Sequence, residues 1–195
     1  MLLILALLAQ AAQSAQPATP VAPDCAHDRA ALLALSQQAF DQDMDGGWRA
    51  LANRGCDAQA ADLIRDWRTR HGVNHPILTW HEGQMRAYIG QTDAAIALFD
   101  QSRKPADEDA PFGWNHYVDG SIAFLRRDRP ALERARAQLA VLPRPEWYKP
   151  VDREGRPQPV QWPMNLHVLD GFLACWDRPY AEAYGCGILS RVKPN

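Results

Sequence analysis

The sequence predicts an all-α protein, a stack of about four antiparallel helical hairpins preceded by a leading helix. Three observations predict this fold. Apolar residues recur at three- and four-residue spacings through most of the chain. Segments that open with a capping residue and continue with alanine-rich apolar residues return along the chain. Glycine or proline stands where one helix should end and the next begin.

The first 23 residues predict that the protein is exported. Leu2–Ala12 is a short apolar run without a charged residue, and small residues follow it in the pattern of a signal-peptide cleavage site. The run is too short to span a bilayer, so a cleaved signal peptide is favoured over an uncleaved anchor. Gln16–Pro23 contains three prolines and is typical of a flexible leader. We therefore expect residues 24–195 to form a single periplasmic or secreted domain without a transmembrane segment.

The chain has four cysteines, and an exported protein meets an oxidising environment, so we expect disulfides. Four cysteines allow three pairings. A leading helix from Cys25 to about Phe40 would be followed by a return segment that ends at Cys56, which brings these two cysteines together. Cys175 and Cys186 flank the last turn and helix. We therefore favour Cys25–Cys56 and Cys175–Cys186, one at each end of the stack.

An acidic turn, Asp41–Gly46, follows the leading helix. Its alternating carboxylates and its glycine are similar to a calcium-binding loop, which presents oxygen ligands around a tight turn. The twelfth position of such a loop should be a bidentate Glu, and here it is Ala52. We therefore favour a structural turn in which Asp45 and Gly46 reverse the chain and cap the next helix.

Four predicted second helices of hairpins share a capping residue followed by alanine-rich apolar residues. They start at Asp57, Thr92, Asp128 and Asp177. Successive starts are 35, 36 and 49 residues apart, so the first two intervals agree and the third contains an insertion. A repeat of this length is typical of a solenoid, in which each hairpin buries its apolar face against its neighbours.

The best-defined hairpin is His75–Ser102. Leu78, Met85 and Tyr88 lie on one side of its first helix, and Gly83 marks a place where another helix can approach closely. Gly90 ends this helix. The second helix begins at Thr92, presents an apolar face of Ala95, Ile96 and Phe99, and ends before Pro105.

This hairpin resembles the tetratricopeptide repeat family. Gly83, Gly90, Ala95 and Phe99 keep the seven-, five- and four-residue steps of the family's glycine, glycine, alanine and large-residue positions. Trp80 lies one position later than the family's tryptophan, and Tyr88 lies two positions later than its tyrosine, so the repeats are degenerate. The resemblance implies a right-handed stack whose first helices line a groove for a peptide or a partner helix. By this resemblance the groove candidates are Trp80, Gln84, Asn115 and Asp119.

Histidines gather in the segment His71–Glu82, where His71, His75, His81 and Glu82 offer imidazole and carboxylate groups suited to a transition metal. Gly72 and Pro76 interrupt the segment, and neighbouring positions of a helix point in different directions. We therefore expect surface or helix-terminal histidines and no metal site.

The insertion is a proline-rich loop at 143–163. It contains six prolines together with Trp147, Tyr148 and Trp162, so it cannot be a helix. Long loops of this kind are often functional, and aromatic side chains dominate interface hot spots. We therefore expect these three aromatics to bind a partner. The alternative is that both tryptophans fold back as a brace over the open edge between the third and fourth hairpins.

The formal net charge is −2, which argues against nucleic acid as the main partner. The sequence contains no motif typical of hydrolases, phosphate loops or dinucleotide binding, so no catalytic residue and no cofactor are predicted. We predict a non-catalytic module of the cell envelope that binds a protein or peptide. The alternative is an envelope protein that binds a small ligand or metal through the Asp41–Asp45 turn or the His71–Glu82 segment.

Overall fold

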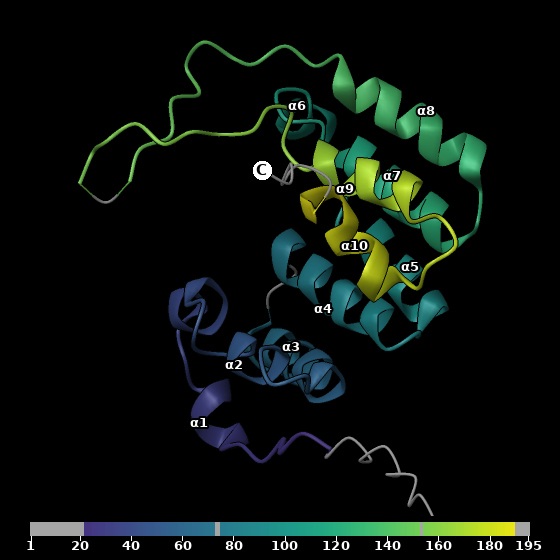
Figure 1. Ribbon diagram of the computed structural model, residues 1–195. Helices are drawn as coiled ribbons and strands as arrows, with labels where there is room; N and C mark the ends of the chain where they lie inside the picture. Colours follow the sequence, from purple (N-terminus) through teal and green to yellow (C-terminus); the bar gives the residue numbers. More distant parts are fainter. Residues whose placement is uncertain (1–21, 73–74, 153, 190–195) are drawn as a thin grey trace, which may run out of the picture.

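The computed structural model describes residues 22–72, 75–152 and 154–189, and it is helical throughout these ranges apart from loops (Figure 1). The predicted signal peptide lies outside the described residues. Within the described ranges there is no β-strand, and a single isolated bridge joins Val151 to Pro157. In the same ranges, no helix has the length and apolar character needed to cross a membrane.

The helices follow one another without intervening strands. In chain order they are α1 (Arg29–Leu33), the π-helical turn η1 (Gln38–Gln42), α2 (Arg49–Ala52), α3 (Asp57–His71), α4 (Pro76–Tyr88), α5 (Thr92–Gln101), α6 (Ala106–Asp109), α7 (Trp114–Leu125), α8 (Arg129–Ala140), α9 (Leu166–Ala174) and α10 (Tyr180–Leu189).

The predicted helix starts agree well with the observed ones. Helix α3 begins at Asp57 and α5 begins at Thr92. Asp128 caps α8, because its Oδ1 accepts a hydrogen bond of 3.0 Å from the backbone N–H of Ala131. The fourth predicted start, Asp177, lies three residues before α10, which begins at Tyr180.

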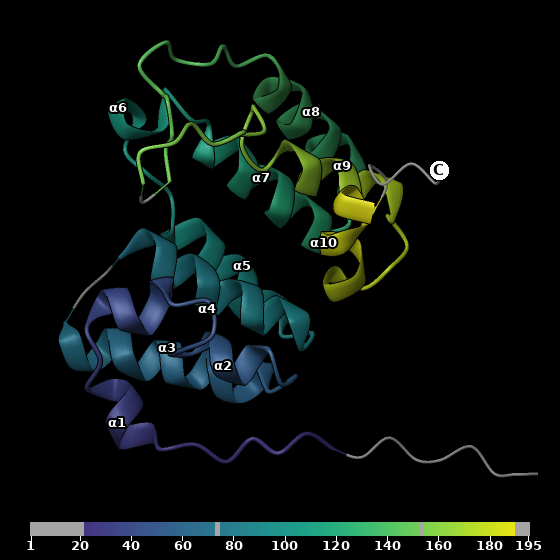
Figure 2. The same cartoon turned by 60° about the vertical axis from the view of Figure 1, so that its left-hand side comes forward.

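Neighbouring helices pack as pairs: α4 with α5, α7 with α8, and α9 with α10, while α3 packs against the other side of α4 (Figure 2). Gly83 shows why the first of these pairs is close. A Cβ atom at Gly83 would lie 2.7 Å from Phe99 Cδ1 and 3.2 Å from Leu98 Cβ. The predicted close approach at Gly83 is therefore confirmed, and its partner is α5.

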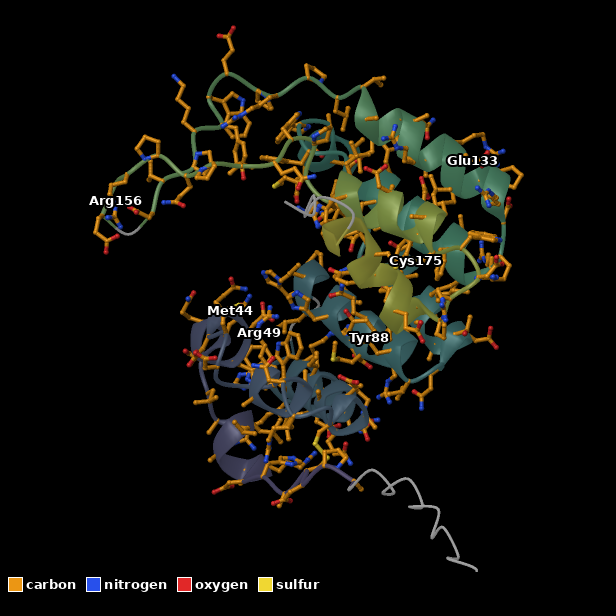
Figure 3. The ribbon with its side chains drawn as sticks, in the orientation of Figure 1. Met44, Arg49, Tyr88, Glu133, Arg156 and Cys175 are labelled. Carbon is orange, nitrogen blue, oxygen red and sulfur yellow. A yellow bond between two sulfur atoms is a disulfide. The ribbon has the colours of Figure 1, made fainter. Side chains whose placement is uncertain are left out.

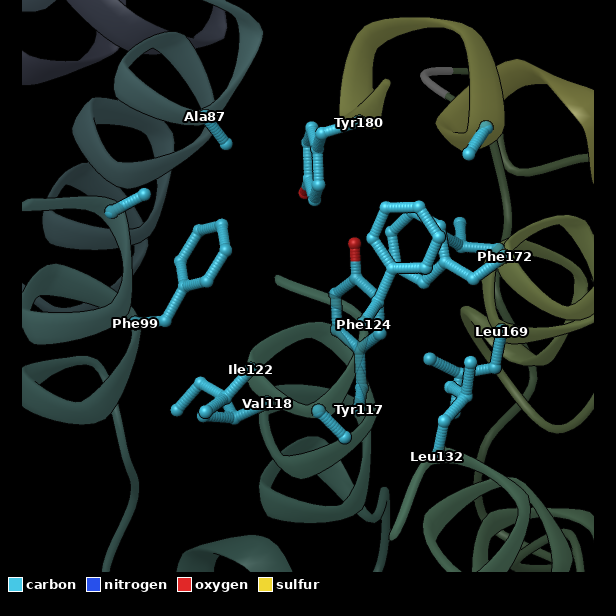
Figure 4. Packing of buried hydrophobic residues seen from close by; sticks show 14 of the residues in the cluster. Ala87, Phe99, Tyr117, Val118, Ile122, Phe124, Leu132, Leu169, Phe172 and Tyr180 are labelled. Carbon is cyan, nitrogen blue, oxygen red and sulfur yellow. The ribbon is translucent and has the colours of Figure 1, made fainter. Parts of the chain in front are cut away.

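Helix α4 is shared between two clusters of buried apolar side chains. Leu78 and Met85 face the cluster formed with α3. Trp80 and Ala87 face the larger cluster, which extends to α10 and is shown in Figure 4. In that cluster the rings of Phe124 and Phe172 stack with centroids 4.4 Å apart, joining α7 to α9.

The prediction of a continuous leading helix from Cys25 to about Phe40 is wrong. The segment contains only α1 and the start of η1, with a break between them. Side chains of α3 occupy two carbonyl oxygens that a continuous helix would use. Trp67 Nε1 donates to the Leu35 oxygen over 3.0 Å, and His71 Nε2 lies 3.0 Å from the Leu33 oxygen.

Both predicted disulfides are present. Cys25 is joined to Cys56 and Cys175 to Cys186, with Cα atoms 5.7 and 6.3 Å apart, and no cysteine of the chain is free. The first disulfide fixes the extended N-terminal segment to the start of α3. The second joins the end of α9 to α10.

Candidate partner-binding site

The proline-rich loop leaves the body of the molecule after α8 and returns to it before α9 (Figure 1). Its described residues contain no helix. Near its far end, Asp152 shapes a turn because its Oδ1 accepts from the backbone N–H groups of Glu154 and Arg156, over 3.0 and 2.8 Å. These hydrogen bonds hold the pKa of the Asp152 carboxyl below its usual value.

The base of the loop gathers the three aromatic residues that the sequence singles out. All three surround Phe112, which precedes α7. The ring centroid of Phe112 lies 5.7 Å from that of Trp147, 5.2 Å from Tyr148 and 6.0 Å from Trp162. These distances are typical of favourable aromatic pairs. The loop is therefore attached to the body through a cluster of rings.

The three loop aromatics differ in what they can offer a partner. Trp162 is half-buried, and its Nε1 donates to the Leu142 oxygen over 2.9 Å, which closes the base of the loop. Tyr148 is also half-buried, with its hydroxyl 3.4 Å from Met164 Sδ. Trp147 is 66% exposed. Trp162 therefore braces the loop, whereas Trp147 presents a large apolar surface to solvent.

A pocket of about 300 Å³ opens beside this cluster. We call it the aromatic pocket, and its lining residues are Lys104, Phe112, Trp114, Tyr148, Met164 and Asn165. Four of them are apolar or aromatic. Lys104 is the single charged residue of the lining, and its Nζ lies 5.4 Å from the centroid of the Trp114 ring.

The wall that carries Phe112 and Trp114 depends on Gly113. This glycine has φ of +64°, and a Cβ atom there would also collide with the side chains of Leu142 and Leu139. The left-handed turn separates the two aromatic side chains immediately before α7. Trp114 is then fixed in place, because its Nε1 donates to the Ser102 oxygen over 2.9 Å.

Asn115 positions Lys104 through the backbone. Its Oδ1 accepts from the Lys104 N–H over 3.0 Å, and its Nδ2 donates to the Lys104 oxygen over 2.9 Å. Asp109 in turn accepts from the Asn115 N–H over 2.7 Å. Asn115, predicted as a groove residue, therefore acts as a clamp that fixes the segment carrying the pocket lysine.

The other groove candidates lie elsewhere. Trp80 is 2% exposed and stacks on Phe99 with centroids 4.1 Å apart, and Gln84 is 7% exposed. Asp119 is exposed and pairs with Arg103 over 2.7 Å. Trp80 and Gln84 thus present no surface for a partner, in contrast to the expectation from the repeat family.

Trp80 is covered by side chains of α5 and α7, because its ring centroid lies 4.1 Å from that of Phe99, 5.0 Å from that of Trp114 and 4.6 Å from that of Tyr117. Helix α10 also packs against α4 (Figure 1). The ring of Tyr88 on α4 lies 5.6 Å from that of Tyr180 and 5.9 Å from that of Tyr184. The C-terminal helix therefore fills the space above α4 with its own aromatic side chains.

The acidic turn is a structural element in the described molecule. Asp41 is fully buried, and its carboxylate accepts hydrogen bonds from Trp48 Nε1 over 2.9 Å and Gln42 Nε2 over 2.6 Å, with His81 Nδ1 2.7 Å away. Asp43, not Asp45, shapes the turn, because its Oδ1 accepts from the Asp45 N–H over 3.1 Å. The expected capping by Asp45 is wrong, since α2 has no side-chain cap.

The His71–Glu82 segment is also engaged in packing. His71 stacks on Trp67 with ring centroids 4.1 Å apart. His81 contacts the Asp41 carboxylate through its Nδ1, and Glu82 pairs with Arg68 over 2.5 Å. Burial raises the pKa of Glu82 in spite of this arginine. Across the described ranges, no set of three or more His, Cys, Asp or Glu side chains is arranged to hold a metal ion.

Sequence reasoning missed most of the pocket. It did not single out Lys104, Phe112, Trp114, Met164 or Asn165 as residues of a binding site. One local signal was present: Phe112-Gly113-Trp114 places two aromatic residues around a glycine just before a helix. Nothing in the sequence joins this signal to the loop, because the two segments meet only through the packing of α7, α8 and α9.

Comparison with protein-family models, with curated proteins and with solved structures gives no match for this chain.

Proposed function

We propose that the protein is an exported, non-catalytic binding module that holds an extended segment of another envelope protein on the aromatic pocket. The segment places one large apolar side chain between Phe112, Trp114 and Tyr148. An acidic residue next to that side chain pairs with Lys104. Trp147 contacts the segment from the loop.

The observation that carries this function is an apolar pocket beside one unpaired ammonium group. Within residues 22–72, 75–152 and 154–189, the Lys104 side chain has no ion pair, and its contact is with the face of Trp114. The pocket volume of about 300 Å³ is at the lower end for ligand sites, which suits a single side chain. Exposed tryptophan beside such a pocket is typical of an interface anchor.

The disulfides support export. All four cysteines are in disulfides, and disulfides persist in oxidising compartments outside the cytosol. They lie at the two ends of the helical stack, where a solenoid lacks neighbouring repeats to bury its edges.

We also infer that the helix pairs form a degenerate stack like that of tetratricopeptide repeats. The pairs α4–α5 and α7–α8, with second helices that start at Thr92 and Arg129, support this arrangement. The contact of Gly83 with Phe99 supports it as well, because those two positions carry the resemblance. An experimental structure with a left-handed rotation between successive pairs would contradict it.

The test uses a photo-crosslinking amino acid at Trp147 in cells that export the protein. The matched control carries the same amino acid at Met44, which is 65% exposed and lies on the turn between η1 and α2 (Figure 3). We expect one recurrent adduct from position 147 that Met44 does not give. The adduct should weaken when Lys104 is changed to Met.

A synthetic peptide that covers the crosslinked region then provides the decisive measurement. We expect it to bind the purified protein, and Lys104→Met and replacement of the peptide's acidic residue should each weaken binding about tenfold. The two changes together should weaken binding by less than the product of their separate effects, because each change removes the same ion pair. Equal binding by a Phe112→Ala, Trp147→Ala variant would reject the aromatic pocket as the site.

A further inference from the structure

A second cavity, of about 280 Å³, lies between α7 and α8 and shares no lining residue with the aromatic pocket. Its floor is formed by small side chains from the two helices, Ala123, Ala131 and Ala135. Short side chains on facing helices leave space between the longer side chains at the rim. The rim of this cavity is strongly charged.

Three arginines line the rim, and they differ in their partners. Arg103 is neutralised by Asp100 and Asp119, with N–O distances of 2.8 and 2.7 Å. Arg126 and Arg134 are exposed, and across the ranges that the structure describes their guanidinium groups take part in no ion pair and no hydrogen bond. Two unpaired positive groups from adjacent helices therefore face one cavity.

The two carboxylates of the lining are already engaged. Asp119 holds Arg103, and Asp128 accepts from the Ala131 N–H at the start of α8. Gln138 completes the rim, and in the described part of the chain its side-chain amide has no hydrogen-bond partner. The unoccupied groups at this rim are thus two guanidinium groups and one amide.

We propose that this cavity binds the phosphate group of a small molecule. A phosphate monoester carries close to two negative charges and three acceptor oxygens, which suits two guanidinium groups and an amide that approach from different helices. Arginine presents several donors in a fixed fork, so each of Arg126 and Arg134 can hold two oxygens. The short alanine side chains of the floor leave room for the ligand atom to which the phosphate group is attached.

A purely structural explanation exists for Arg126. It follows the last residue of α7, where a positive side chain interacts favourably with the helix dipole. This explanation predicts a small effect on stability and no effect on anion binding. It says nothing about Arg134, which lies in the middle of α8.

The test is calorimetric titration of the full exported chain with inorganic phosphate at low ionic strength, where screening is weak. We expect a dissociation constant of about 1 mM or tighter. Arg126→Gln and Arg134→Gln should each weaken binding about tenfold. Arg70→Gln is the control, because it removes the same charge from an exposed position at the end of α3.

Three results would overturn the assignment. One is the absence of phosphate binding to a chain whose circular dichroism shows it to be folded. Another is an equal loss of binding in Arg70→Gln and Arg126→Gln, which would indicate nonspecific attraction. The third is tighter binding of succinate than of phosphate, which would indicate a dicarboxylate site. None of these three results bears on crosslinking at Trp147. The phosphate site and the binding of an extended segment at the aromatic pocket can therefore fail separately.

Discussion

Asp41 is a charged side chain without exposed surface, and it joins the turn after η1 to α4. Burial alone would raise its pKa, but the contact with His81 and the hydrogen bonds from Trp48 and Gln42 lower the pKa to about 2. Arg49 lies nearby, with its Nη2 3.8 Å from Asp41 Oδ1. The ionised carboxylate is therefore the state that the folded protein stabilises.

The sign of the pH dependence follows from this lowered pKa. The ordinary value is 3.8, so Asp41 binds a proton less readily in the folded chain than in the unfolded chain. Its contribution of about 2 kcal/mol to the free energy of unfolding is complete above pH 4 to 5 and is lost as the pH falls towards 2.

Urea unfolding should therefore show Asp41→Asn to be much less stable than the parent protein at pH 7, with a smaller difference at pH 2.5. Asp45→Asn, at an exposed position of the same turn, is the control. A difference that does not change with pH would show that Asp41 acts by shape alone.

Trp147 and Trp162 should separate binding from stability. Trp147 is mostly exposed, so Trp147→Ala should change the free energy of unfolding by less than about 0.5 kcal/mol. Trp162→Ala removes a half-buried ring and the hydrogen bond to Leu142, so it should cost about 2 kcal/mol. Denaturant unfolding of the two variants checks this, and equal losses would mean that Trp147 is also part of the brace.

At the scale of the helix, packing of α4 on α5 depends on the absence of a side chain at Gly83. An alanine there would press on the ring of Phe99 and on Leu98, so Gly83→Ala should destabilise by about 1–3 kcal/mol. Gly185, in α10, is the matched control, because an added Cβ there meets nothing within 4 Å. Gly185→Ala should be neutral or slightly stabilising, since alanine favours helix. Thermal unfolding that shifts equally in both variants would contradict the proposed close packing.

Helix starts and helix ends were predictable because their causes are local. A capping side chain such as Asp128 and a glycine such as Gly90, which adopts φ of +76°, act on the residues next to them. The break in the leading helix was not predictable, because it depends on Trp67 and His71 reaching back from α3 to the Leu33 and Leu35 oxygens. These side chains compete with backbone N–H groups for the carbonyl oxygens, and they lie about 32 and 38 positions further along the chain.

At the scale of the molecule, the sequence identified the loop side of the candidate site and missed most of the pocket lining. Trp147, Tyr148 and Trp162 stood out because aromatic residues among prolines cannot form a helix core. Lys104 and Asn165 became part of the site only through the packing of α7 against α8 and α9. The expected groove at Trp80 failed for the same reason, because the rings of Phe99, Trp114 and Tyr117 from α5 and α7 cover Trp80.

The return of α10 gives the two disulfides different roles. Cys175–Cys186 closes a loop of 11 residues and Cys25–Cys56 a loop of 31, so chain entropy alone assigns about 3 and about 4 kcal/mol to them. Native-state hydrogen exchange should distinguish them further, because it reports local opening. Changing Cys175 and Cys186 to alanine should raise exchange in α10 before α4 and α5, since α10 is then held by noncovalent packing alone, mainly on α9. Removing Cys25–Cys56 should leave α10 protected and raise exchange near the start of α3. If both double variants raise exchange uniformly, the molecule opens as one unit, and α10 is a full member of the core rather than a cover held over Tyr88.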